Sequence, residues 1–165
     1  MDTTFFKVGA AERQDRLVVL SQNNSLIIFD YAEDSDGQGY NYRKYYDHVP
    51  TLAEIRSDIE ALINAQTDEK ILSGFKWNDM PVWLSTENQF NFKAAYDLAV
   101  QTKGKTLPVT FKLGEDTEGK PMYHTFDKLA DFTDFYTLAM THVVTALAEG
   151  WQRKDSIDYS NYKAE

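Results

Sequence analysis

The first fifty residues are dominated by short apolar, β-branched runs separated by turn residues. Leu17 to Leu20 and Leu26 to Tyr31 are two such runs, and a polar turn at residues 22–25 joins them. Runs of this kind on either side of a turn predict a β-hairpin. The glycines and acids of "DSDGQG" interrupt the pattern, and the aromatic stretch "YNYRKYYDHV" resumes it as extended chain. Residues 1–50 are therefore expected to form a β-rich N-terminal region with the hairpin as an arm.

A helical pattern begins at residue 51. Thr51 and Glu54 have the spacing of a capping box, in which each side chain accepts a hydrogen bond from the backbone N–H of the other. The apolar positions that follow recur every three to four residues: Leu52, Ile55, Ile59, Leu62 and Ile63. This spacing predicts an amphipathic helix that packs one face against the rest of the protein.

After Gly74, a hairpin followed by a helix occurs twice, at about residues 74–103 and 107–153. In the first, aromatic runs surround a turn, and Ser85 or Thr86 can cap a helix that Gly104 ends. In the second, apolar and polar residues alternate from Val109, as in a half-buried strand, and a long apolar stripe predicts the last helix.

The two segments match each other at an offset of forty residues. The identical pairs are Gly74 with Gly114, Pro81 with Pro121, Phe92 with Phe132, Tyr96 with Tyr136, Leu98 with Leu138 and Ala99 with Ala139. Helical periodicity alone can align apolar positions, but it does not require paired glycines and prolines, so a duplicated ββα unit is favoured.

The predicted class is α+β, because hairpins and helices are segregated along the chain. The two hairpins can pair into one four-stranded antiparallel sheet that the helices cover on one face. We expect a β-rich region at residues 1–50, an α+β domain at residues 51–158 and a polar tail at residues 159–165.

Length and charge narrow the classes of function. A chain of 165 residues is long enough for one ordinary core. Its formal net charge of -9 disfavours nucleic acid, because phosphate contacts need a basic face. No apolar run approaches the roughly 20 residues of a membrane helix, and the N-terminus does not read as a secretory signal. We expect a protein that is made in the cytoplasm, is not secreted by a signal peptide and has no membrane contact; incorporation into a larger particle is left open.

Catalytic and metal-binding patterns are weak. The sequence has no cysteine, which excludes disulfides and thiolate chemistry. It has neither a Gly-x-Ser-x-Gly elbow nor a phosphate-binding glycine loop. "EDSDGQG" resembles a calcium loop, but the positions that should carry the end ligands are Ala32 and Arg43, which favours a solvated turn.

The remaining candidates for chemistry are histidines and carboxylates. His48, His124 and His142 have no second histidine at metal-binding spacing. The carboxylates of "LGEDTEGK" are typical of a charged hairpin tip. We therefore expect no enzyme activity, no cofactor and no metal; an enzyme that uses scattered carboxylates is the third-ranked hypothesis.

Aromatic residues, 14% of the chain, are the one unusual signal. Tyrosine and tryptophan suit interfaces and stacking surfaces, because they combine a large contact area with a polar group. They can equally fill a small core, which is the favoured position for Trp83, Phe92 and Tyr96. The candidate interaction surface is Tyr40, Tyr42, Tyr45, Tyr46 and Trp77.

Two stretches, "GFKWNDMPVWLSTENQFNFKAAYDLA" and "AEGWQRKD", mark a resemblance over residues 49–158. They resemble an uncharacterised domain family that bacteriophages and prophages encode, particularly those of gut bacteria and often near tail-fibre genes. The resemblance implies a phage or prophage setting and supplies no catalytic residue.

The expected function is accordingly a non-enzymatic structural or interaction protein of a phage or prophage particle, associated with the tail or virion or assisting assembly. Its expected partners are other phage structural proteins or a second copy of itself. The alternative is a small module that binds glycans or another ligand through an aromatic surface.

Overall fold

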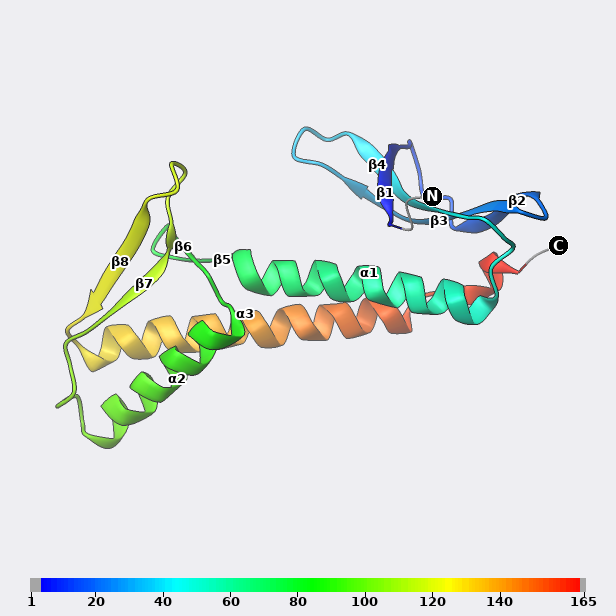
Figure 1. The fold of residues 1–165 in the computed structure, drawn as a ribbon. Coiled ribbons are helices and arrows are strands. Elements are labelled where there is room, and N and C mark those ends of the chain that lie inside the picture. The colour runs from blue at the N-terminus through cyan, green and yellow to red at the C-terminus, as the bar shows by residue number, and fades with distance from the viewer. Residues whose placement is uncertain (1–3, 164–165) are drawn as a thin grey trace. The chain divides into compact units, whose positions relative to one another are not determined.

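The computed structural model describes residues 4–163 and confirms the α+β class. The strands are β1 (Phe6–Gly9), β2 (Arg16–Ser21), β3 (Asn24–Glu33), β4 (Gly39–Tyr46), β5 (Phe75–Trp77), β6 (Met80–Val82), β7 (Val109–Glu115) and β8 (Pro121–Phe126). The helices are α1 (Leu52–Ser73), α2 (Thr86–Gln101), α3 (Leu129–Asp155) and the 3₁₀ helix η1 (Tyr159–Tyr162). Figure 1 shows their order along the chain.

The chain divides into two compact units, and the divisions fall inside α1 and α3. Unit 1 contains the residues up to Asn64 together with those from Arg153 onward, and unit 2 contains Ala65–Gln152. The domain boundaries expected from the sequence, at residues 50 and 158, stay a prediction.

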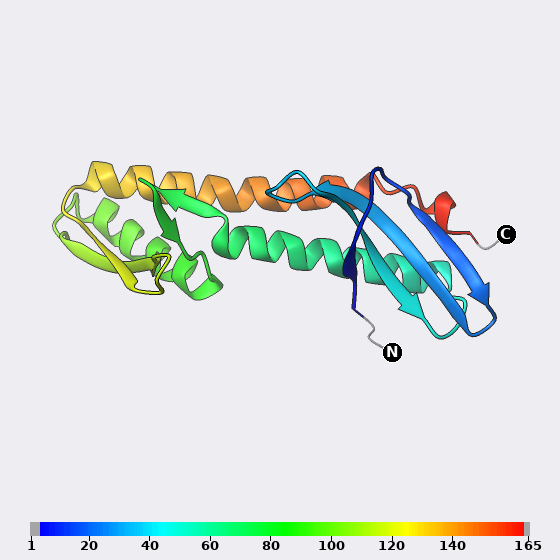
Figure 2. The same ribbon diagram turned by 90° about the horizontal axis from the view of Figure 1, so that it is seen from above.

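Unit 1 is built on a four-stranded antiparallel sheet with the strand order β1-β4-β3-β2. The predicted hairpin is present as β2 and β3, where Leu17 lies opposite Ile27. Figure 2 shows the long strand β3 between β2 and β4. Because β3 is central and the side chains from Leu26 to Phe29 are all buried, the sheet contributes residues to unit 1 packing on both of its faces.

The core of unit 1 is aliphatic where the sheet meets α1. Its buried members are Ile27, Phe29, Tyr46, Ile55, Ile59, Ile63 and Tyr162. The helix begins as predicted: the N–H of Thr51 donates to Glu54 Oε2 at 2.7 Å, and the N–H of Glu54 donates to Thr51 Oγ1 at 3.3 Å. These bonds satisfy N–H groups that have no partner within the helix, and so fix where it starts.

A bulge in β3 anchors the far end of the chain. Asp30 has φ of 61° at the point where the register between β3 and β4 shifts. Its N–H donates to Asp15 Oδ1 at 2.7 Å, and its carboxylate accepts from Arg153 at 3.0 Å. A bulge redirects side chains at the cost of a local interruption of the ladder. Here it presents a carboxylate to the end of α3.

The prediction of a polar tail at residues 159–165 is wrong for the residues that the structure describes. Residues 159–162 form η1, and Tyr162 is 2% exposed in the unit 1 core. Asp158 caps η1 by accepting the N–H of Ser160 at 2.9 Å. Because the neighbouring residues are polar, the sequence did not indicate that this aromatic ring is buried. Residues 164 and 165 lie outside the described part of the chain.

Unit 2 repeats the order strand, strand, helix, as predicted. Hairpin β5–β6 precedes α2, and hairpin β7–β8 precedes α3. Figure 1 shows both hairpins on the same side of these helices. Ser85 caps α2, and its Oγ accepts the N–H of Asn88 at 3.2 Å.

The two hairpins do not merge into the four-stranded sheet that we expected. They form separate two-stranded sheets, with the N–H of Trp83 donating to Leu113 O at 2.7 Å between them. Strands β5 and β6 have three residues each, whereas β7 has seven and β8 has six. The short strands of the first hairpin offer too few backbone groups for a longer ladder.

The paired glycines, which favoured a repeat, serve different purposes. Gly74 follows α1, and a Cβ there would lie 2.4 Å from Lys70 O. Gly114 lies late in β7, where a Cβ would lie 2.5 Å from Pro81 O. Both positions exclude a side chain, but one ends a helix and the other lets two hairpins approach. This pair therefore does not argue for duplication.

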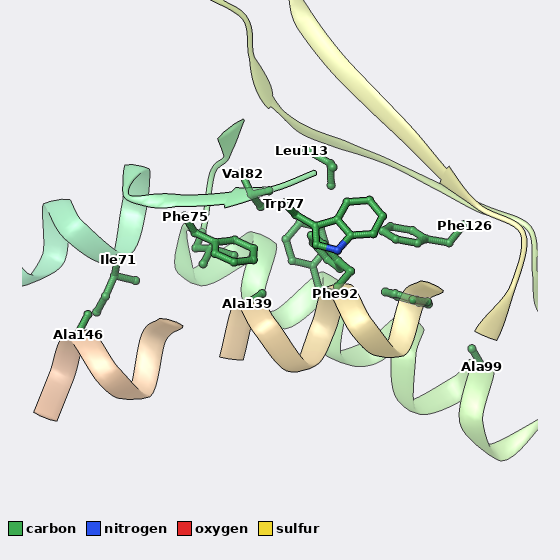
Figure 3. Packing of buried hydrophobic residues seen from close by; sticks show 13 residues of the cluster. Ile71, Phe75, Trp77, Val82, Phe92, Ala99, Leu113, Phe126, Ala139 and Ala146 are labelled. Atoms are coloured by element: carbon green, nitrogen blue, oxygen red, sulfur yellow. The ribbon is translucent and has the colours of Figure 1, made fainter. Parts of the chain in front are cut away.

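The core of unit 2 is predominantly aromatic. It contains Phe75, Trp77, Phe92, Phe126, Phe132 and Phe135 together with smaller apolar residues. Figure 3 shows the indole of Trp77 at the centre of this cluster, with Phe126 and Phe92 nearby. Helix α3 supplies Phe132 and Phe135, and it carries no charged side chain from Phe135 to Ala148.

Candidate interaction surfaces

The tyrosines of β4 do not form one surface, because they lie on both faces of the sheet. Side chains alternate along a strand, so Tyr40, Tyr42 and Tyr46 share one face and Tyr45 points to the other. Spacing alone could have shown that a single face holds at most three of them.

Tyr46 is a core residue of unit 1. It is 6% exposed, and its hydroxyl donates to Asp58 Oδ2 on α1 at 2.6 Å. Lys44, two residues earlier, pairs with the other oxygen of Asp58 at 2.6 Å. Burial and the bond to Asp58 raise the pKa of Tyr46, because both disfavour the phenolate. The side chain fastens β4 to α1 and is not available to a partner.

Tyr40 and Tyr42 are half-buried and contact each other. Their rings lie 5.4 Å apart at 86°, in the edge-to-face arrangement that ring quadrupoles favour. Lys7 Nζ lies 4.2 Å from the centre of the Tyr40 ring. The hydrogen bond with Tyr42 and the nearby Lys7 lower the pKa of Tyr40, while burial raises the pKa of Tyr42. A partner protein could therefore contact only the edges of these two rings.

Tyr45 is the predicted surface tyrosine that is most open to solvent. It is 38% exposed and stacks on Phe6 of β1, which is 41% exposed, with ring centres 5.6 Å apart. At the other edge of the sheet, β2 leaves Val19 and Leu20 exposed. Unit 1 therefore carries a small stacked aromatic pair that another protein can reach.

Trp77 lies in the core and not on a surface. It is 5% exposed, and its Nε1–H donates to Asp134 Oδ2 on α3 at 2.9 Å. His124 packs edge-to-face against it at 4.8 Å. The period of two in "FKW" gives the reason: Phe75 and Trp77 are buried while Lys76 between them is exposed.

Trp83, which the sequence favoured as core, is 44% exposed. Val82 and Leu84 on either side of it are each 1% exposed, so the strand alternation turns the indole outward. That alternation was visible in "PVWLS" and would have placed it correctly.

Outward-facing residues of the second hairpin extend the surface around Trp83. Lys112 and Tyr123 are paired across β7 and β8, so they share a face, and Tyr123 is 65% exposed. On the same face, the hydroxyls of Thr110 and Thr125 lie 2.8 Å apart. We call Trp83, Lys112 and Tyr123, with the residues lining the adjacent depressions, the Trp83 platform.

Two depressions flank Trp83. One, of about 310 Å³, is lined by Trp83, Ser85, Asn88, Lys112, Leu113 and Gly114. The other, of about 200 Å³, is lined by Leu72, Ser73, Pro81, Val82, Trp83, Gly114 and Glu115. Lys112 Nζ donates to Glu115 Oε1 at 2.7 Å, so the charges at the platform are balanced.

The residues weighed for metal binding occupy structural positions. Asp34 Oδ1 accepts the N–H groups of Asp36 and Gln38, each at 2.9 Å, and so closes the "DSDGQG" turn. The ring of His48 contacts Asp47 and Glu54, and His142 Nε2 lies 2.9 Å from Lys70 O. Across residues 4–163, no group of three or more histidine and carboxylate side chains is placed to hold a metal ion.

Comparison with known proteins places most of the chain in one family. The family described as a domain of unknown function, DUF4376, matches residues 54–165. The chain belongs to this family. No curated protein and no solved structure matches the chain.

The DUF4376 match covers all of unit 2 and begins after the N-terminal sheet. The Trp83 platform therefore lies inside the family region, whereas β4 and its tyrosines lie outside it. Within residues 4–163, no helix has both the length and the apolar character needed to cross a membrane.

Proposed function

We propose that the protein is a non-enzymatic interaction protein that docks onto another protein through the face of the unit 1 sheet that carries Phe6 and Tyr45. The stacked and exposed pair of Phe6 and Tyr45 carries the proposal. Aromatic side chains at the centre of an interface lose little conformational entropy and bury large areas, which is why they dominate binding energies.

The edge of the same sheet supports docking. β2 ends the strand order, and Val19 and Leu20 on it are 47% and 56% exposed. An exposed edge strand offers unpaired N–H and C=O groups to an extended segment of a partner. Pairing at β2 would be a second contact, because β3 lies between β2 and the strands that carry Phe6 and Tyr45.

The partner class is a structural protein of a phage or prophage particle, which the protein joins at the tail or virion or helps to assemble; a second copy of this chain is the other partner we consider. The resemblance of residues 49–158 to phage-encoded domains motivates this setting. In this setting the protein is made in the host cytoplasm and needs no cofactor.

The test is sedimentation of extracts from cells that produce the encoding phage or prophage, with antibody detection of the protein. We expect the protein to travel with particles or assembly intermediates. A double variant, Phe6→Ser with Tyr45→Ser, should remain free, whereas the control Val49→Ser, which changes an exposed residue outside the sheet, should not. A wild-type protein found only as a free species would refute the proposal.

Light scattering on the purified chain separates the two partner classes. A monomeric mass that is unchanged in the double variant points to a foreign partner. A multiple of the chain mass that the double variant reduces to the monomer points to self-association.

A further inference from the structure

The Trp83 platform of unit 2 has the properties of a ligand site that the proposed function leaves unused. Its parts come from four places in the sequence: the end of α1, hairpin β5–β6 with the residues after it, the start of α2 and hairpin β7–β8. The backbone bond from Trp83 N–H to Leu113 O fixes the indole beside β7. Gly114 lines both depressions, and the close approach of Pro81 O excludes any side chain there.

The surface combines the exposed indole and a few apolar side chains with several polar groups. Around the indole lie a hydroxyl (Ser85), an amide (Asn88), an ammonium (Lys112) and a carboxylate (Glu115). Asn88 is oriented by its Nδ2, which donates to Trp83 O at 2.8 Å, and Ser85 by its role as the cap of α2. Polar groups held in this way meet a ligand at little additional entropic cost.

These features together select the chemistry of the ligand. A sugar ring has an apolar face of C–H groups, which stacks on an indole, and a rim of hydroxyls, each of which can donate and accept hydrogen bonds. Lys112 supplies donors and Glu115 supplies acceptors, and their charges cancel. Polar groups border the indole in the larger depression, where Ser85, Asn88 and Lys112 lie, and apolar side chains of Leu72, Pro81 and Val82 border it in the smaller one. A sugar, which has both C–H faces and hydroxyls, matches this mixture.

Charge disfavours anionic stacking ligands. Nucleotides and acidic sugars carry negative charge, and the paired Lys112 and Glu115 leave no excess positive charge at the site to offset the formal net charge of -9 of the chain. The two depressions, of about 310 and 200 Å³, adjoin the same indole, so successive units of one chain can occupy them.

We propose that the Trp83 platform binds a neutral oligosaccharide, with one sugar ring stacked on Trp83 and its hydroxyls bonded to Lys112, Glu115 and Asn88. This inference goes beyond the docking role of unit 1 and does not depend on it. The two sites lie in different units and use different residues.

The experiment is a screen of the full-length protein against neutral oligosaccharides of hexoses and N-acetylhexosamines by saturation-transfer NMR, followed by titration of those that bind. We expect at least one neutral oligosaccharide to bind. Trp83→Ala should weaken its affinity by about tenfold or more, because both the stacking and the apolar area are lost. Trp83→Phe should retain a large part of the affinity, since it keeps a ring.

A matched control is Trp151→Ala. Trp151 is 58% exposed and belongs to unit 2, but it lines neither depression. Its removal should leave the affinity unchanged. Lys112→Met is a second test variant that leaves the packing intact, because Lys112 is a surface residue, and it should weaken binding several-fold. Circular dichroism verifies that each variant is folded.

Four results would overturn the proposal. They are the absence of binding to any neutral oligosaccharide of the screen, binding confined to acidic sugars, affinity that Trp83→Ala leaves unchanged, and an equal loss in Trp151→Ala. A doubled native mass that Trp83→Ala abolishes would instead assign the platform to a second copy of the chain.

Discussion

The two units of this protein bury different kinds of side chain. Unit 1 joins its sheet to α1 mainly through Ile27, Ile55, Ile59 and Ile63, whereas unit 2 packs six aromatic rings between its hairpins and helices. Isoleucine side chains pack without a preferred ring orientation. Aromatic rings have preferred orientations, so a cluster of them specifies its geometry more tightly and depends more on each member.

Phe135 is the member on which the aromatic cluster depends most. Its ring lies within 6.5 Å of those of Phe75, Trp77, Phe92, Phe126 and Phe132. Phe135→Ala should lower the free energy of unfolding by about 3–5 kcal/mol, because it leaves a cavity that five rigid rings cannot fill. Urea denaturation measures the change.

The control for this substitution is Phe90→Ala on α2. Phe90 is 70% exposed, so its loss should change the free energy of unfolding by less than about 0.5 kcal/mol. Equal effects at the two positions would show that the cluster does not carry the stability of unit 2.

The hydrogen bond between Trp77 and Asp134 is the next largest contribution that can be tested. Asp134→Ala leaves the buried indole N–H without its acceptor, which should cost about 1–3 kcal/mol. Asp131→Ala removes a carboxylate one turn earlier on α3 and serves as the control. The idea fails if the two variants unfold at the same urea concentration.

Substitutions in the isoleucine core of unit 1 should lower the free energy of unfolding by less. Ile59→Val removes one methylene group from a fully buried side chain and should cost about 0.5–1.5 kcal/mol. Val144→Ala, at a 65% exposed position of unit 2, should be near neutral. A cost at Ile59 as large as that at Phe135 would remove the contrast between the two cores.

The smallest predicted effect is a pH dependence at the start of α1. The hydrogen bond to Asp47 raises the pKa of His48, and the backbone bond from Thr51 lowers the pKa of Glu54. The contribution of His48 to the stability of the fold is therefore complete at a pH below its ordinary pKa of 6.5, and it is lost as the pH rises through the raised pKa. The contribution of Glu54 to stability is complete at a pH above its ordinary pKa of 4.5, and it is lost as the pH falls through the lowered pKa.

The midpoint of urea unfolding, measured from pH 6 to about pH 9, tests this assignment. The wild type should lose a little stability over that interval, and His48→Gln should lose less. Identical profiles would mean that His48 contributes nothing. Both groups lie at the surface, so salt should weaken the effect.

The most accurate predictions from the sequence concerned structural features that depend on residues close together in the chain. Thr51 with Glu54 was found correctly and the cap of α2 was placed at Ser85 or Thr86, of which Ser85 is the cap, because capping is a contact between residues three positions apart. The N-terminal hairpin and the twofold order of hairpin and helix were found from periodicity, which is also local.

The least accurate predictions from the sequence concerned which face of a strand or helix is buried. Trp77 and Trp83 were assigned to the wrong sides, since burial depends on what packs against a strand, and a tryptophan is compatible with either face. Tyr46 and Tyr162 look polar by type but fill the unit 1 core. The four-stranded sheet failed because strand length, set by Gly74 and the turn after Trp77, was not considered.

The absence of lysine and arginine from most of α3 also determines how this helix behaves under digestion. Between Lys128 and Arg153 the sequence has no lysine or arginine. Trypsin therefore has no site in Leu129–Gln152, and it releases the hydrophobic part of α3 as one long peptide even from the unfolded chain. In mass spectrometry that single peptide carries Phe132, Phe135 and Trp151 together, so labelling or isotope exchange in the helix is read from one fragment.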